Sequence, residues 1–254
     1  MRYAIDDSLT MIGRSLRHAT RALDSLLLGV LLPVFLLLLF VHVFGGAIAT
    51  GTAYVNYVVP GIVLLCAGYG AAGTAVSVAS DMVTGVIDRF RSLPILSSAV
   101  LTGHVVASLA RNLFSTLLVV CVALASGFRP SAGPLEWLAA FGVLTLFIIA
   151  MSWLSVCFGL VAGSVEGASS FGFFILFLPY LSSAFVPVDT MPGALRLFAE
   201  HQPITPVIET LRGLLLGGAV GDSAWLAIAW FTGLLVLSYA TATALFNRRA
   251  GASS

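Results

Sequence analysis

Residues 25–80 read SLLLGVLLPVFLLLLFVHVFGGAIATGTAYVNYVVPGIVLLCAGYGAAGTAVSVAS and contain no Asp, Glu, Lys or Arg. A helix needs about 20 mostly apolar residues to cross the hydrocarbon core of a bilayer. The stretch is long enough for two such helices, and three glycines and two threonines between residues 45 and 52 interrupt it. We therefore expect the first two membrane spans at residues 25–44 and 55–79.

The whole chain has the composition of a membrane protein. Of its 254 residues, 59% are hydrophobic and only 9% are charged, whereas a soluble domain carries about 25% charged residues. The mean hydropathy of +1.05 agrees with this. Such a chain would expose large apolar patches in water, so the bilayer is its expected solvent. The net charge of +1 gives no reason to expect a nucleic-acid partner.

Four further apolar stretches complete the predicted bundle. The sequence thus predicts an all-α membrane protein in which a single domain, residues 1–254, contains six transmembrane helices. An even number of spans places both termini on the same side of the membrane. The four stretches are residues 104–127, 137–161, 168–187 and 222–246.

The distribution of the basic residues, all 12 of which are arginines, predicts the orientation in the membrane. Nine fall on the side of the termini and of the loop between the second and third spans, with Arg111 placed near that end of its span. Arg129, Arg196 and Arg212 fall on the other side. Because cytoplasmic loops carry an excess of Lys and Arg, we expect both termini to be cytoplasmic in a multi-pass protein of the cell (inner) membrane.

The motifs of an independent catalytic site are missing from the sequence. It has no Lys, which the P-loop signature GxxxxGK[ST] needs to reach the phosphates of a nucleotide. It also has no HExxH and no GxSxG motif. Cys66, Cys121 and Cys157 lack metal-binding spacing, and we interpret them as small buried hydrophobic residues. We expect no catalytic residue, bound cofactor or metal ion on this chain.

The N-terminal segment, residues 1–24, has the pattern of an amphipathic helix. Because it leads directly into the first span, we expect it to lie in the membrane interface with its arginines toward lipid phosphates. An ordinary solvated helix is the alternative. Its apolar face carries Leu9, Ile12, Leu16 and Leu23, and its polar face carries Arg14, Arg17 and Arg21.

The segment at residues 80–103 is the most charged part of the middle of the chain. Apolar residues recur in it at helical spacing, and Pro94 ends the pattern because a proline disfavours helix at the preceding residue. The pattern predicts a short amphipathic cytoplasmic helix. Its charged residues are Asp81, Asp88, Arg89 and Arg91, and its apolar residues are Met82, Val86, Phe90 and Leu93.

The segment before the last span, residues 188–221, is interrupted by prolines and is too short for a full span. Thr205 followed by Pro206 is a typical helix start, and Gly217 with Gly218 is a typical stop. We expect one or two half-inserted helices on the outer side, in a re-entrant segment that packs against protein or lines water. The predicted apolar face holds Val207, Ile208, Leu211, Leu214 and Leu215, and the polar face holds Glu209 and Arg212.

Four stretches of the chain, in this order and spacing, resemble the permeases of type-2 ABC exporters, in particular the daunorubicin/doxorubicin resistance type of actinobacteria. They are LPVFLLLLFVHVFGG at 32–46, DxxxGxxDRFRSLPI at 81–95, LPYLSSAFVPVDTMP at 178–192 and HQPITPVIETLRGL at 201–214. One departure is that Ala99 follows Ser98 where the family often has an arginine. With the span count, the resemblance covers nearly the whole chain.

The resemblance implies a function and a set of partners. Such permeases form dimers, with a second copy or a related chain, and dock on two copies of a separately encoded ATPase that binds ATP and magnesium. The first and fifth spans would line the dimer interface, and the substrate would be a hydrophobic or amphiphilic, drug-like or lipid-like molecule exported from the cytoplasm.

The resemblance also assigns residues to two of these roles. The helix that couples to the ATPase would carry Asp81, Gly85, Asp88, Arg89, Arg91 and Pro94. The outer segment, which would cap the exit, carries Phe185, Pro187, Met191, Pro192, Pro203 and Pro206.

Two other functions remain open on the residues alone. A proton-coupled carrier needs paired ionisable residues within the membrane; apart from His42, which is either interfacial or functional inside the membrane, the spans hold almost none. Glu200 and His201 are the other candidates for a proton or cation site. A membrane-embedded lipid-modifying enzyme needs clustered acids or histidines, and the acids at residues 81–91 lack metal-binding spacing.

Overall fold

The computed structural model describes residues 23–48, 50–85 and 97–251. Within these ranges the chain is all-α, which confirms the predicted fold class. The α-helices are α2 (Leu23–Leu39), α3 (Tyr54–Val83), α5 (Ser97–Ala125), α6 (Pro134–Val161), α7 (Val165–Phe177), α8 (Gly193–His201), α9 (Ile204–Leu216) and α10 (Ser223–Gly251). A π-helix, η1 (Phe40–Phe44), and two 3₁₀-helices, η2 (Leu178–Leu181) and η3 (Val188–Thr190), extend or connect them.

Four of these helices are long and apolar enough to cross a membrane: α3, α5, α6 and α10. Two shorter apolar helices, Gly29–Phe44 and Val165–Leu181, occupy the places of the first and fifth predicted spans. The structure therefore accounts for four spans by length and composition, and the count of six stays a prediction.

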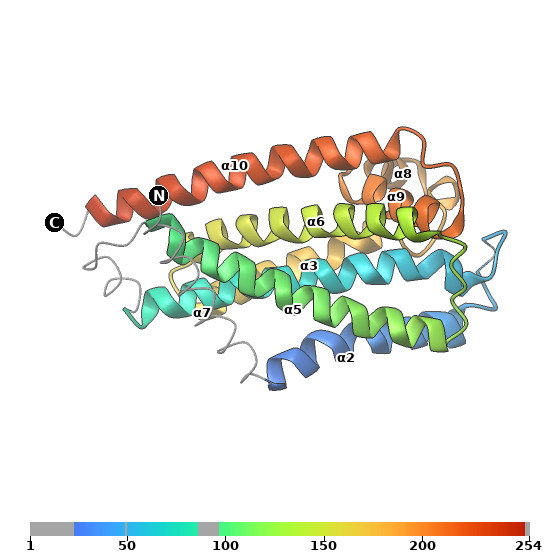
Figure 1. Cartoon of the computed structure of the whole chain (residues 1–254), viewed down its shortest axis with the longest axis horizontal. Coiled ribbons are helices and arrows are strands. Elements are labelled where there is room, and N and C mark those ends of the chain that lie inside the picture. Colours follow the sequence, from blue (N-terminus) through green and yellow to red (C-terminus); the bar gives the residue numbers. More distant parts are fainter. Residues whose placement is uncertain (1–22, 49, 86–96, 252–254) are drawn as a thin grey trace.

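The long helices lie side by side in one bundle (Figure 1). α6 lies between α3 and α10, and α3 also packs against α5 and α7. In their most apolar windows, 72% of α3 is buried but only 22% of α10, so α3 is the central helix and α10 a peripheral one. The short helices α8 and α9 gather at one end of the bundle, which we call the α8–α9 end.

Local sequence signals account for several helix boundaries. α6 begins at Pro134, whose missing N–H is not needed in a first helical turn, and Glu136 in that turn favours the positive end of the helix dipole. α7 begins after Ser164, whose Oγ accepts a hydrogen bond from Gly167 N at 3.0 Å. α9 ends at Gly217, which has a φ of +69° and so adopts the left-handed conformation of a C-terminal cap.

Small residues allow α3 to approach its neighbours closely. A Cβ built on Gly159 of α6 would lie 2.6 Å from the carbonyl oxygen of Ala75. A Cβ on Gly61 would lie 2.6 Å from Cβ of Ala184. Gly163, in contrast, faces open space. Gly159 therefore serves close packing between α6 and α3.

The fifth predicted span, residues 168–187, does not continue as a helix to its expected end. The α-helix stops at Phe177, and the 3₁₀-turn η2 carries the helical path only to Leu181. Ser182 then has an extended backbone, and its Oγ donates to the Pro179 carbonyl at 2.5 Å. The Ser182 N–H donates to the same carbonyl, and these two hydrogen bonds close the turn that ends the helical path.

Candidate functional site

The central helix α3 ends in a turn that leads toward the predicted coupling segment. Gly85 has a φ of +68°, and its N–H donates to the Met82 carbonyl at 3.2 Å. Thr84 Oγ1 donates to the Ser80 carbonyl at 2.8 Å. A left-handed glycine after the last helical turn is a common helix stop, and it fixes the direction in which the chain leaves α3.

Asp81 connects this end of α3 to the following helix. Its Oδ2 lies 3.3 Å from Nε2 of His104 in α5. The other ring nitrogen, Nδ1 of His104, lies 3.3 Å from Oγ of Ser77. Asp81 was among the predicted site residues, whereas His104 was not. Ser77 and Asp81 are four residues apart and so share one face of α3, and this face meets His104.

Most of the predicted coupling helix lies outside the described residues. Asp88, Arg89, Arg91 and Pro94 fall in residues 86–96, and Arg14, Arg17 and Arg21 of the predicted interfacial helix fall in residues 1–22. Of the predicted coupling residues, the structure thus places Asp81 and Gly85. Met82, expected in the coupling helix, belongs to the last turn of α3.

At the α8–α9 end, Arg212 of α9 connects three parts of the chain. Its Nη2 donates to the Ser183 carbonyl at 2.6 Å, and its Nε and Nη2 lie 3.3 and 3.2 Å from the Tyr57 carbonyl oxygen. The guanidinium carbon lies 3.8 Å from the centre of the Tyr57 ring, within cation–π range. Arg212 was predicted on the polar face of this helix, and it lies there partly buried, with backbone carbonyls of α3 and of the loop after η2 as its partners.

Arg212 stays a cation although it is partly buried. Burial lowers the pKa of its guanidinium from the ordinary value, while Tyr57 and Glu209 act in the opposite direction. Since an arginine does not lose its proton in proteins, the charge stays and must be satisfied by the carbonyls and the ring.

Two tyrosines at the start of α3 hold the loop that follows η2. Tyr57 Oη donates to the Ser183 carbonyl and Tyr54 Oη to the Phe185 carbonyl, each at 3.0 Å. Phe185, a predicted residue of the outer segment, is buried and stacks on Phe40 at 4.4 Å between ring centres. The loop thus bridges the end of α7, the start of α3 and the end of the first apolar helix.

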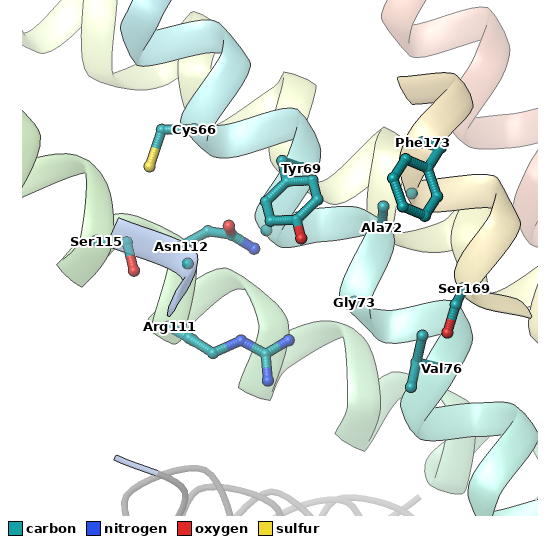
Figure 2. Close-up of a pocket in the computed structure, with 13 residues that line it drawn as sticks. Cys66, Tyr69, Ala72, Gly73, Val76, Arg111, Asn112, Ser115, Ser169 and Phe173 are labelled. Atoms are coloured by element: carbon teal, nitrogen blue, oxygen red, sulfur yellow. The ribbon is translucent and has the colours of Figure 1, made fainter. Parts of the chain in front are cut away.

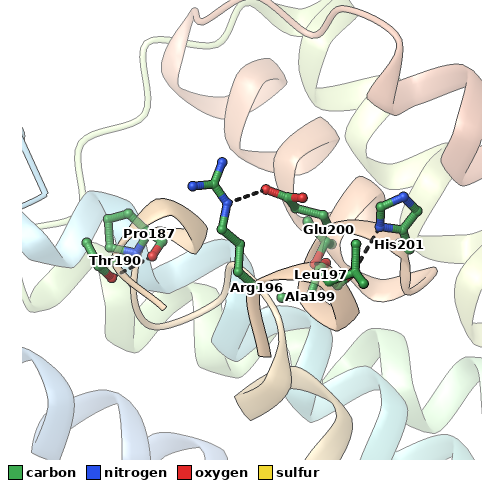
Figure 3. Close-up of polar contacts among 8 residues, drawn as sticks. Pro187, Thr190, Arg196, Leu197, Ala199, Glu200 and His201 are labelled. Carbon is green, nitrogen blue, oxygen red and sulfur yellow. Dashed lines mark hydrogen bonds and ion pairs between the residues drawn. The ribbon is translucent and has the colours of Figure 1, made fainter. Parts of the chain in front are cut away.

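The prolines of the outer segment each lie at a boundary, as their residue type favours. Pro187 precedes η3, and its carbonyl accepts from Thr190 Oγ1 at 2.6 Å (Figure 3). Pro192 precedes α8, and Pro203 precedes α9. Pro206 lies in the first turn of α9, which starts two residues earlier than the predicted Pro206 start, and Met191 follows η3.

The structure confirms two short helices in the outer segment, α8 and α9. The face of α9 expected to be apolar is largely buried, with Val207, Ile208, Leu211 and Leu215 in the core. The candidate pair Glu200 and His201 has local partners: Glu200 Oε1 accepts from Arg196 Nε at 2.7 Å, and His201 Nδ1 lies 2.9 Å from the Leu197 carbonyl (Figure 3).

A cavity of about 350 Å³ lies among α2, α3, α5 and α7 (Figure 2). Arg111 lines this cavity. The predicted orientation assumed that Arg111 lies near the cytoplasmic end of its span. Arg111 instead lies midway between Ser97 and Ala125, because α5 begins seven residues before the predicted start. This correction leaves eight arginines on the side predicted to be cytoplasmic, against three on the other.

Comparison with known proteins defines the class. Residues 8–216 match the family described as ABC-2 type transporter, and the chain belongs to this family. It is 31% identical over 218 residues to the "Daunorubicin resistance ABC transporter permease protein DrrB1" of Streptomyces coeruleorubidus, covering 85% of this chain and 77% of that protein.

A second relative is similar over almost the whole chain. The "Probable doxorubicin resistance ABC transporter permease protein DrrC" of Mycobacterium tuberculosis (strain ATCC 25618 / H37Rv) is 25% identical over 254 residues, covering 98% of this chain and 91% of that protein. The suspected family is thereby confirmed, and the chain is a transport component with apolar helices suited to a membrane.

Proposed function

We propose that this chain is the membrane-spanning permease subunit of an ATP-driven exporter that moves a hydrophobic or amphiphilic, drug-like or lipid-like substrate out of the cytoplasm. The observation that carries the proposal is the family match over residues 8–216, which includes both the end of α3 and the outer segment. The printed names of two relatives, which describe drug-resistance permeases, support the substrate class.

In this proposal six spans cross the membrane, with both termini in the cytoplasm. Residues 23–44, which form α2 and η1, would extend about 33 Å at the helical rise of 1.5 Å per residue, enough for a core of about 30 Å. Residues 165–181 would extend about 26 Å on the same basis, slightly less than the thickness of the hydrocarbon core. A membrane accommodates such a mismatch by local thinning.

The energy would come from ATP and magnesium bound to a separately encoded ATPase, present in two copies. This chain has no Lys and so cannot supply a P-loop. The segment between Gly85 and Ser97 would contact the ATPase, because α3 and α5 hold its two ends and the Asp81–His104 contact ties those helices together. Movement of the ATPase would then be passed directly to the central helix α3.

A second permease, either a copy of this chain or a related one, would pair with the faces of α2 and α7 that carry exposed aromatic residues. Phe35 of α2 is 59% exposed, and Phe174 of α7 is 65% exposed. Phe177 continues the face of α7. In a monomer these rings would contact only lipid, whereas in a dimer they would pack against their counterparts.

The coupling assignment is tested by co-expressing the permease with an ABC ATPase encoded next to it and measuring export and ATP turnover in proteoliposomes. Asp81→Ala and Arg89→Ala should insert normally and abolish most export, because the first breaks the tie between α3 and α5 and the second removes a charge from the segment that would contact the ATPase. Arg248→Ala, on the C-terminal helix α10, is the matched control and should export normally. Full export with normal ATP turnover in both Asp81→Ala and Arg89→Ala would refute the assignment.

A further inference from the structure

The cavity among α2, α3, α5 and α7 has a polar side and an apolar side (Figure 2). The polar side is formed by Arg111, Tyr69 and Ser115. The opposite side is mainly apolar, with Val76 of α3 and Phe173 of α7, and it also carries the hydroxyl of Ser169. Such a division between charged and apolar walls suits a molecule with a charged head and an apolar body.

Arg111 is an intramembrane cation in the proposed arrangement. It lies about 21 Å along α5 from either end of the helix, at 1.5 Å per residue, which is far from both membrane surfaces. A charge at this depth is costly, and such residues face a partner or an aqueous cavity and mark substrate or ion pathways. Arg111 is partly buried and lines the cavity.

No counter-charge lines this cavity within the described part of the chain. The lining contains no Asp or Glu there, and Arg111 forms no hydrogen bond or ion pair with the side chains described, which are those of residues 29–48, 50–85 and 100–248. The neighbouring Asn112 is already engaged: its Nδ2 donates to the carbonyl and the hydroxyl of Ser108 at 2.9 and 3.1 Å. The guanidinium therefore keeps its donors for a ligand.

A glycine keeps the space beside the guanidinium open. A Cβ built on Gly73 of α3 would meet only Nη2 of Arg111, at 3.6 Å. Tyr69, one helical turn away on the same helix, points its hydroxyl into the cavity, as Figure 2 shows. Within the described residues this hydroxyl has no hydrogen-bond partner, so it can donate to the same ligand.

We propose that this cavity binds the anionic head of an amphiphile, with Arg111 as the specificity-determining residue. The head would be a phosphate, sulfate or carboxylate, which the planar guanidinium binds through two parallel hydrogen bonds. The apolar part of the molecule would lie along Phe173. This inference rests on the proposed function, since it names the charge class of the exported substrate; a cationic amphiphile is repelled by the same residue.

Binding is measured on the full-length permease in phosphatidylcholine nanodiscs, with empty nanodiscs subtracted. The probes are dodecyl phosphate, dodecyltrimethylammonium with the same chain and opposite charge, and inorganic phosphate. We expect dodecyl phosphate to bind, dodecyltrimethylammonium not to bind, and inorganic phosphate to bind about tenfold or more weakly because it lacks the chain. Equal binding of either control probe would overturn the proposal.

The variants separate charge from shape. Arg111→Gln should weaken dodecyl phosphate binding by about tenfold or more, and Arg111→Lys by less, because it keeps the charge but loses the paired donors. Arg129→Gln, an exposed arginine in the α5–α6 connection, is the matched control and should bind as the wild type does. Undiminished binding by Arg111→Gln would sink the idea.

Gly73→Val keeps the charge of Arg111 and fills the space beside the guanidinium, so it should also weaken binding of dodecyl phosphate. If Arg111→Gln fails to fold, this variant tests the site in its place. Unchanged binding by Gly73→Val would likewise count against the site. Competition with phosphatidic acid identifies the source: displacement assigns a membrane lipid, and no displacement assigns a non-lipid anionic amphiphile. Because none of these measurements needs an ATPase, failure to find an ATPase partner would leave the binding result intact.

Discussion

Arg212 is a single residue that joins segments far apart in the sequence. Its guanidinium contacts the carbonyl oxygens of Tyr57 and Ser183 and stacks on the Tyr57 ring. Residues 57 and 183 belong to the start of α3 and the loop after η2, so one side chain positions three parts of the α8–α9 end.

Replacing Arg212 with Met should destabilise the permease by about 1–3 kcal/mol, because the two carbonyls lose a charged donor in a partly buried site. The midpoint of thermal unfolding in detergent measures this. Arg196→Met is the control: Arg196 is exposed, and its ion pair with Glu200 contributes little, so we expect no measurable change. Equal effects of the two substitutions would contradict the role given to Arg212.

Gly85 determines how the chain leaves α3. With φ at +68°, an alanine there would be strained by about 1 kcal/mol, whereas asparagine tolerates this conformation better. Gly85→Ala should therefore reduce export in proteoliposomes more than Gly85→Asn does. Gly193→Ala, at a site with open space and no left-handed backbone, should leave export unchanged. The same loss of export in Gly85→Ala and Gly193→Ala would argue against a specific turn.

At the scale of elements, the contact between α3 and α6 depends on a glycine. Gly159 lets the α6 backbone approach Ala75 and Val78 so closely that a methyl group has no room. Because α3 is the central helix, a shift at this crossing would also affect α5 and α7, which pack against it.

Gly159→Ala should therefore destabilise the bundle by about 1–3 kcal/mol through overpacking. Gly163→Ala, four residues later in open space, should be neutral or slightly stabilising. Unfolding of both variants by a chemical denaturant in the same detergent gives the comparison. A neutral Gly159→Ala would show that the two helices are not in close contact in the detergent-solubilised protein.

Element boundaries were predicted best where one residue carries the signal. Gly217, with its left-handed φ, ends α9 as expected. The end of the fifth span was missed, because Ser182 turns the chain by bonding to Pro179 and apolar residues continue beyond it. Hydropathy does not distinguish a helix from a buried loop when both are apolar.

At the scale of the whole molecule, the proposed topology places the C-terminus and the connection between α9 and α10 on opposite sides of the membrane. A fluorescent protein fused after Ser254 should be fluorescent, because it stays in the cytoplasm. Alkaline phosphatase inserted after Gly218 should be active, because that connection is outside. Phosphatase activity at the C-terminus, or its absence at Gly218, would require a different number of spans.

The bilayer solvent, the all-α class and the approximate places of the helices follow from the sequence alone. Charge-free stretches such as residues 25–80 cannot be hydrated, and only helices satisfy their backbone within a membrane when no barrel is formed. The family motifs and the glycine that ends α9, Gly217, are likewise recognised from short stretches of sequence. These properties depend on neighbouring residues, so they can be read without knowing the packing.

The tertiary structure alone decided what the isolated charged residues contact. His104 meets Asp81, Arg212 meets carbonyls from two distant segments, and Arg111 meets an open cavity. In the sequence these residues look alike, as single polar positions among apolar ones. Their roles differ because the partner of a buried charge is set by how the helices pack around it, and the helix register of α5 places Arg111 at mid-span.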